Sequence, residues 1–331
     1  MQNNSGIIKT NHQNHFGGFV FDMYNEFNSE PFPDIIDSID LYDWGDMIEM
    51  LYRKFEFKLP LIMKKEFDKT FEVSDNNKVV LGFSGGLDSV YQAIWLKEHG
   101  YEVILYHLKG INTYENSQAS KQCPFIAEHL GMTYVESTIT KKRGVQQWPE
   151  NPLKNQLILS LMTDYCIDND IKYVSLGDDF NLSLADSVTG VNVTDAREIT
   201  QSFLRGLQRF VNIEFLQVEE CSKLTRINKL IDYGLENFYY SCVQSGRFNQ
   251  SLHKKAEEKY GVKLFNNNCG CYCRKCAMHN LLLHYGDVKF FPQEFIDKCW
   301  RTMWDNSYSA DYELFKPELS LDQRIHNLFT Y

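Results

Sequence analysis

KVVLGFSGGLDSVYQAIWLKEHGYEVILYHL, residues 78–108, decides the fold of this chain. Residues 79–83 are rich in apolar and β-branched side chains and are typical of a buried strand, and a second such run follows at 103–108. The segment 89–99 between them has the length and composition of a helix. Strand, glycine turn, helix and strand make one βαβ unit, which predicts a parallel sheet.

The alternation of strands and helices continues beyond this unit. We expect a helix at 119–130, a strand at 134–137, a helix at 157–167 and a strand at 173–177. The sequence therefore predicts an α/β fold with a doubly wound, Rossmann-like parallel sheet. We divide the chain into an acidic, aromatic N-terminal extension, the α/β domain and a helical C-terminal region, at residues 1–77, 78–212 and 213–331.

Composition limits the classes of function. The formal net charge of −10 disfavours an extended nucleic-acid surface. No run approaches the ~18 apolar residues that a membrane span needs, and the first residues lack the pattern of a secretory signal. Four of the nine cysteines lie within eight residues, which favours a metal site over disulfides. We expect a cytoplasmic protein with no membrane partner.

The turn after the first strand has the features of a phosphate site. Ser84, Gly85, Gly86, Leu87, Asp88 and Ser89 stand at the carboxyl end of a strand and open a helix. Backbone N–H groups in such a turn and at a helix N-terminus bind anionic oxygens, and the glycines allow close approach. Asp88 could cap the loop or help to hold Mg²⁺. The pattern is neither Walker A nor Gly-x-Gly-x-x-Gly, and a plain Gly-rich turn is the alternative interpretation.

The cysteines predict a second site. Cys273-x2-Cys276 and Cys269-x3-Cys273 have the spacing of zinc ligands, and Cys242 adds a fourth thiolate. Cys271 is the fifth candidate, which we take as the spare one. A structural Zn²⁺ site fits this pattern; buried apolar cysteines, a catalytic thiol or a redox pair are the alternatives.

Ser-Gly-Gly-x-Asp-Ser after an apolar strand resembles the PP-loop of the N-type ATP pyrophosphatases. When this motif and the cysteine pattern are taken together, the chain is most similar to the 7-cyano-7-deazaguanine synthase family, over residues 78–285. Further matching residues are Asn155, Asp178, Asp195 and Arg197. The chain departs from the family pattern in having one extra residue between its first two clustered ligands, and Thr-Asp-Ala-Arg in place of Pro-Asp-Cys-Arg.

The resemblance implies an ATP-dependent carbon–nitrogen ligase in queuosine biosynthesis. Its cofactors would be ATP, Mg²⁺ and Zn²⁺, and its substrates 7-carboxy-7-deazaguanine and ammonia. Ser84 and Asp88 would be catalytic, within an ATP-binding loop of residues 84–89. Asp195 would bind the guanine-like edge and Arg197 a carboxylate or phosphate, with Asn155 and Asp178 also at the substrate.

Two other functions remain open from the sequence. One is a PP-loop enzyme that adenylates a different acceptor, such as another carboxylate or a tRNA base. The other is a non-catalytic ATP-binding module. A homodimer, and a protein partner for residues 1–77, are left open as well.

Overall fold

The computed structural model describes residues 8–10, 16, 70–109, 119–139, 154–177, 185–186, 191–192, 200, 203–219, 221–239, 242, 246–266, 268–305 and 312–330. Three predicted substrate residues, Asp178, Asp195 and Arg197, lie outside this set.

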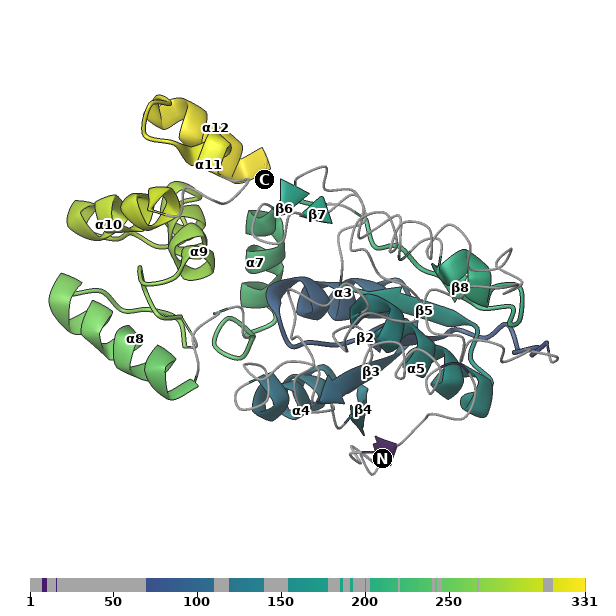
Figure 1. Cartoon of the computed structure of the whole chain (residues 1–331). Helices are drawn as coiled ribbons and strands as arrows, with labels where there is room; N and C mark the ends of the chain where they lie inside the picture. The colour runs from purple at the N-terminus through teal and green to yellow at the C-terminus, as the bar shows by residue number, and fades with distance from the viewer. Residues whose placement is uncertain are drawn as a thin grey trace, which may run out of the picture.

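A six-stranded sheet forms the centre of the α/β domain, and every neighbouring pair of strands is parallel (Figure 1). In sheet order the strands are β1 (Ile8–Thr10), β4 (Thr133–Thr138), β3 (Glu102–Lys109), β2 (Lys78–Gly82), β5 (Tyr173–Leu176) and β8 (Glu214–Phe215). The four central strands occupy the predicted positions to within about one residue. A two-stranded antiparallel ribbon, β6 (Ala185–Asp186) and β7 (Val191–Asn192), stands apart from this sheet.

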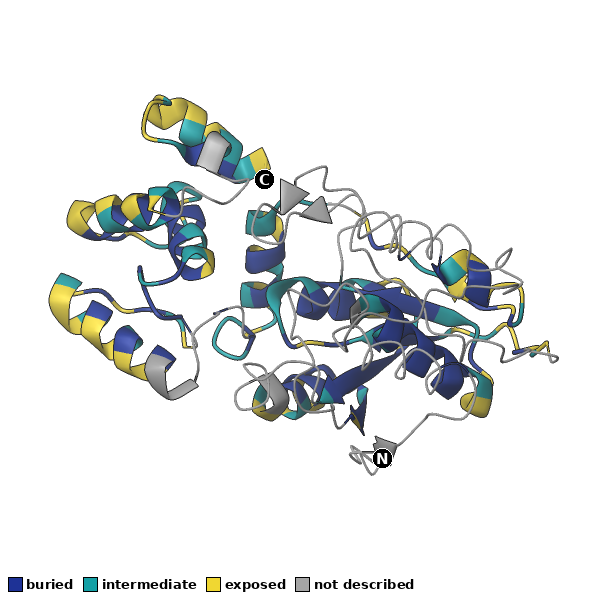
Figure 2. Ribbon diagram, viewed as in Figure 1, coloured by how far each residue is buried: buried dark blue, intermediate teal, exposed yellow. Residues whose placement is uncertain are grey.

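Helices cover both faces of the sheet. Alternate side chains of a strand point to opposite faces: Val79 and Leu81 pack with α3 (Leu87–Glu98) and α4 (Ala119–Leu130), whereas Val80 packs with α5 (Lys154–Asn169). Burial on both sides explains why the strands read as continuous apolar runs, and the central strands are dark in Figure 2. The doubly wound α/β fold is therefore confirmed.

Two strands of the sheet lie outside the predicted 78–212 domain. β1 comes from the N-terminal extension and pairs with β4, while β8 comes from just beyond residue 212. The extension also contributes a core residue, because the Phe16 ring is buried and its N–H donates to Asp164 Oδ1 at 2.7 Å. Part of the extension is thus an element of the α/β domain.

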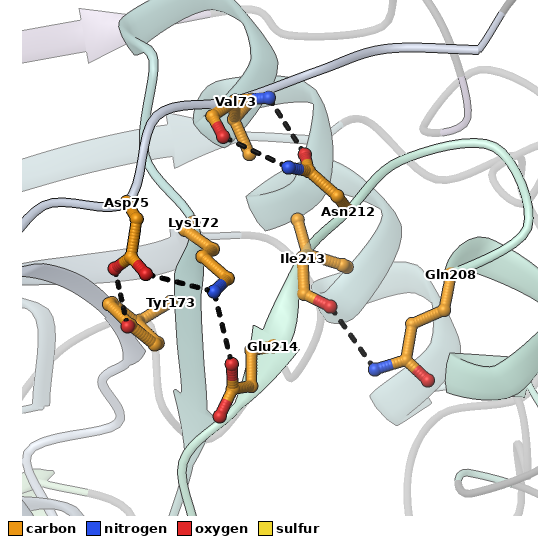
Figure 3. Close-up of polar contacts among 8 residues, drawn as sticks. All are labelled: Val73, Asp75, Lys172, Tyr173, Gln208, Asn212, Ile213 and Glu214. Atoms are coloured by element: carbon orange, nitrogen blue, oxygen red, sulfur yellow. Dashed lines mark hydrogen bonds and ion pairs between the residues drawn. The ribbon is translucent and has the colours of Figure 1, made fainter.

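Polar contacts hold the segment before β2 against the amino edge of the sheet, by which we mean the side where the parallel strands begin (Figure 3). Asn212 accepts a bond from Val73 N–H at 2.7 Å and donates to its carbonyl at 3.0 Å. Asp75 accepts from Tyr173 Oη at 2.6 Å and pairs with Lys172 at 3.2 Å. We call this set of contacts the amino-edge clasp; it lies at the opposite edge from the loop that follows β2.

The C-terminal region is helical as predicted. Its helices are α7 (Lys223–Asp232), α8 (Gly246–Tyr260), α9 (Arg274–Tyr285), α10 (Gln293–Trp304), α11 (Tyr312–Phe315) and α12 (Leu321–Thr330). They share an apolar core that includes Leu281, Phe295, Trp300, Phe315 and Leu328. Helix α7 stands between α3 and α9 (Figure 1). Within the described ranges, no helix is both long and apolar enough to cross a membrane.

Candidate functional site

The loop after β2 is shaped by its backbone. Phe83 N–H donates to Tyr106 O at 2.8 Å, which carries the β2–β3 ladder one residue past the end of β2. Gly85 then adopts a φ of +73°, a conformation that favours glycine. Gly86 is extended and stands at the N-cap of α3, with no side-chain cap. A glycine at the N-cap has no side chain to compete with a ligand for the N–H groups that begin a helix, where anions often bind.

Two hydroxyls close the loop on itself. Ser89 Oγ donates to Gly86 O at 3.2 Å, so its single hydrogen is used there. The 3.2 Å contact between the Ser84 and Ser89 hydroxyls is then donated by Ser84, which also accepts from Gly86 N–H at 3.3 Å. Ser84 is exposed and Ser89 is buried. Of these two hydroxyls, that of Ser84 is the one open to solvent.

A histidine holds the start of the loop. His107, at the end of β3, is 3% exposed, and its Nδ1 lies 2.8 Å from Phe83 O. Because a carbonyl only accepts, Nδ1 carries the proton. His107 therefore supports the backbone at the start of the loop.

Gly177, just past β5, lets the start of α3 approach the sheet. A Cβ at this position would lie 3.1 Å from Ser89 Cβ and 3.2 Å from Ser89 N. Any larger residue would therefore push against the first turn of α3. The glycine that ends this strand is explained by that contact.

Asp88, in the first turn of α3, is paired with an arginine from the C-terminal region. Arg226 Nη1 on α7 lies 2.6 Å from Asp88 Oδ1. The arginine side chain is 7% exposed and the aspartate side chain 42%. Sequence reasoning missed Arg226; its only sequence signal is an arginine on a helix that follows Ser222-Lys223.

Comparison with known proteins bears on this loop and its strands. Residues 77–165 match the family model described as the tRNA methyl transferase HUP domain. This match supports a PP-loop domain of the ATP pyrophosphatase superfamily at these residues. The tRNA-specific 2-thiouridylase MnmA of Lactobacillus helveticus (strain DPC 4571) is 26% identical over 125 residues, which cover 31% of this chain and 33% of that protein. The chain thus spans about a third of the length of this curated relative.

Two solved structures are similar at a greater distance. The U34-tRNA thiolase NcsA of Methanococcus maripaludis, with its 4Fe-4S cluster, matches at 12% identity and a TM-score of 0.31, covering 67% of this chain and 76% of its own. The NH3-dependent NAD synthetase of Campylobacter jejuni subsp. jejuni NCTC 11168, in complex with nitrate, matches at 15% identity and a TM-score of 0.33. This match covers 81% of this chain and 94% of the synthetase chain. These similarities are too distant to assign an activity.

One predicted substrate residue of the PP-loop domain lies in the described region. Asn155 lies in the first turn of α5, and its neighbour Gln156 donates to Thr200 Oγ1 at 3.0 Å. In the sequence, Thr200 follows Arg197 by three residues, so this contact joins a residue that follows each of the two candidates.

The structure brings four cysteines together in the C-terminal region. Sulfur atoms of Cys242, Cys269, Cys273 and Cys276 all lie within 4.8 Å of one another, and all four residues are buried. Cys273 is the N-cap of α9 and Cys276 lies in its first turn, which is why the x2 spacing converges. Four sulfurs at such distances match the ligand number of a tetrahedral metal site.

The fifth cysteine lies elsewhere. Cys271 belongs to the apolar core with Phe295 and Leu281, outside the group of four. Hydrogen bonds with the neighbouring thiols, Cys242 first, together with burial, raise the pKa of the Cys276 thiol well above its usual value. A bound metal cation reverses this by favouring thiolates.

Proposed function

We propose that the protein is an ATP-dependent adenylating enzyme that releases pyrophosphate. The observation that carries this proposal is the loop after β2: Gly85 in its left-handed conformation and Gly86 at the N-cap connect the strand to α3, and the Ser84 and Ser89 hydroxyls lie 3.2 Å apart in the same turn. Such groups bind phosphate oxygens at fixed positions and stabilise charge that develops on a leaving pyrophosphate. The match of residues 77–165 to the HUP domain supports the same reaction class.

As acceptor we propose 7-carboxy-7-deazaguanine, on the sequence resemblance. Its carboxylate oxygen would attack the α-phosphorus of ATP, and pyrophosphate would leave. Ammonia would attack the acyl carbon, lose a proton and displace AMP, giving the amide. The amide oxygen would then attack the α-phosphorus of a second ATP, releasing a second pyrophosphate. Loss of AMP and of the two N–H protons would give the nitrile.

No side chain needs to act as a nucleophile in this sequence of steps. Ser84, Asp88 and the loop amides would position the phosphates, and Asn155, Asp178, Asp195 and Arg197 the acceptor. A carboxylate accepts two hydrogen bonds from a guanine-like N–H edge, and a guanidinium binds a carboxylate or phosphate with two.

Magnesium and zinc enter as separate proposals. The half-exposed Asp88 carboxylate at the loop offers the hard oxygen ligand that Mg²⁺ prefers. Mg²⁺ bound there would neutralise charge on the phosphates. The four buried thiols offer the ligand set of a closed structural Zn²⁺ site.

A second candidate function is the adenylation of a tRNA base before thiolation. The observation that favours it is the 26% identity with a tRNA-specific 2-thiouridylase. Against it stands the net charge of −10, because binding of tRNA phosphates is driven by Lys and Arg.

The first test is pyrophosphate release by purified protein with Mg²⁺ and ATP. Incubation with 7-carboxy-7-deazaguanine and ammonium should give acceptor-dependent pyrophosphate and a product of nitrile mass. Asp88→Ala and Ser84→Ala should lower the rate, the former on the order of 100-fold. Ser74→Ala is the matched control, since that hydroxyl bonds Asp170 far from the loop.

The outcomes separate the candidates. Pyrophosphate that depends on unmodified tRNA instead of the deazapurine would replace the leading substrate with the second one. ATP that binds without turnover in either case would contradict an adenylating enzyme and favour the binding module.

A further inference from the structure

Arg226 reaches the PP-loop from a different part of the chain. It lies on α7, 138 residues after Asp88. Ser222 caps α7 by accepting from Thr225 N–H at 3.1 Å, and Leu230 packs into the core that α3 shares. The backbone that carries Arg226 is therefore fixed against α3.

The guanidinium has a defined orientation. Its Cζ atom lies 5.8 Å from the centre of the buried Tyr91 ring, on the next turn of α3, and Nη1 reaches Asp88. Burying a guanidinium is costly unless it is paired, and this one is 93% buried beside a carboxylate that is itself half exposed. A carboxylate held at one oxygen by a rigid donor has few rotamers left.

The two carboxylate oxygens of Asp88 differ in their hydrogen bonding. Oδ1 bonds Arg226, while in the described part of the chain Oδ2 makes no hydrogen bond. Asp88 is three residues from Gly85, beside the N–H groups that open α3. Arg226 thus fixes which oxygen remains for a ligand at the loop.

We propose that Arg226 is a positioning residue for Mg²⁺-ATP, acting through Asp88. This inference rests on the proposed ATP-dependent function. Arg226 occupies one oxygen of Asp88 and orients the other towards the ion that accompanies the phosphates. Its permanent positive charge also offsets the electrostatic repulsion between the Asp88 carboxylate and the ATP phosphates.

Binding of ATP, measured by calorimetry at several Mg²⁺ concentrations, tests this role without an acceptor. Arg226→Gln should raise the Mg²⁺ concentration needed for half-maximal ATP affinity by about 10-fold to 100-fold, as is usual for partners of metal ligands. Arg226→Lys keeps the positive charge but lacks the planar guanidinium with its several donors. Its Mg²⁺ requirement should fall between those of Arg226→Gln and wild type. The double variant Arg226→Gln with Asp88→Asn should bind ATP no more weakly than Asp88→Asn alone.

Lys229→Gln is the matched control. Lys229 lies one turn further along α7 and pairs with Glu98 of α3 at 2.7 Å, so it joins the same two helices away from the loop. Its loss should leave the Mg²⁺ dependence unchanged. Melting temperatures of the ATP-free variants report any general loss of stability.

Three results would overturn the inference. Equal Mg²⁺ dependence in Arg226→Gln and wild type would exclude positioning while leaving the adenylating function intact. Losses that add to those of Asp88→Asn and do not vary with Mg²⁺ would mean direct contact with ATP instead. Absence of ATP binding by wild type would contradict the proposed function as well.

Discussion

The PP-loop and the cysteine cluster differ in what holds their side chains and backbone in place. The loop is held by the protein itself, through the β2–β3 ladder, His107 on Phe83 O and the close packing of Gly177 on Ser89. The cluster consists of four buried thiols that face one another, and thiols are weak hydrogen-bonding groups. A phosphate site can therefore be ready before its ligand arrives, whereas a thiol cluster gains its stability from an ion.

The largest effect should follow from removing a metal ligand. Cys273→Ala should abolish bound zinc, about one ion per chain in wild type, and loosen the helices around α9. Structural zinc contributes on the order of 10 kcal/mol in small domains. Metal analysis and limited proteolysis measure both effects.

Cys271→Ala is the control for that experiment. It removes a buried thiol from the neighbouring apolar core and should retain the zinc. Full metal content in Cys273→Ala would contradict the four-thiolate site, and loss of metal in Cys271→Ala would change its ligand set.

A smaller effect is expected at the loop from Gly177→Ala. The added methyl group would lie 3.1 Å from Ser89 Cβ and 3.2 Å from its Cα and N, so the first turn of α3 must move. Overpacking of this kind costs about 1–3 kcal/mol. We expect ATP affinity, measured by calorimetry, to fall by roughly 10-fold.

Gly131→Ala is a control that separates a general loss of stability from a local effect on the PP-loop. Gly131 has a φ of +65° and open space around it, so alanine there costs about 1 kcal/mol of stability. ATP affinity should not change in this variant. If both glycine variants weaken ATP binding equally, the loop is not shaped locally by Gly177.

The smallest effect should come from the amino-edge clasp. Bonds from Tyr173 and from Lys172 lower the pKa of Asp75 below its usual 3.8. A depressed carboxyl pKa adds stability above pH 3.8, and that stability is lost as the pH falls through the lowered value. Asp75→Asn should therefore melt slightly below wild type at pH 7, and the difference should shrink as the pH falls below 3.8. A difference that persists in acid would mean that the hydrogen-bond geometry matters and the charge does not.

The central strands and the PP-loop were predictable because their signals are local. Residues 78–108 contain two strands, a helix and the glycine turn in one continuous stretch. β1 and β8 were not predicted, since strands of three and two residues have no periodicity and form only by pairing with β4 and β5.

Candidate site residues divide in the same way. The spacing of Cys273 and Cys276 is set by one turn of α9 and could be read directly. The pairing of Arg226 with Asp88 spans 138 residues and depends on how α7 packs on α3, which no local pattern records.

The shortness of β1 and β8 has a consequence for how the molecule behaves among copies of itself. A long open strand at the edge of a sheet offers a row of unpaired N–H and C=O groups on which another chain can pair. In the described part of the chain, the sheet ends in three residues on one side and two on the other, and Glu214 places a charge on the second. Its long, apolar strands are kept inside, so the sheet is poorly suited to edge-to-edge aggregation.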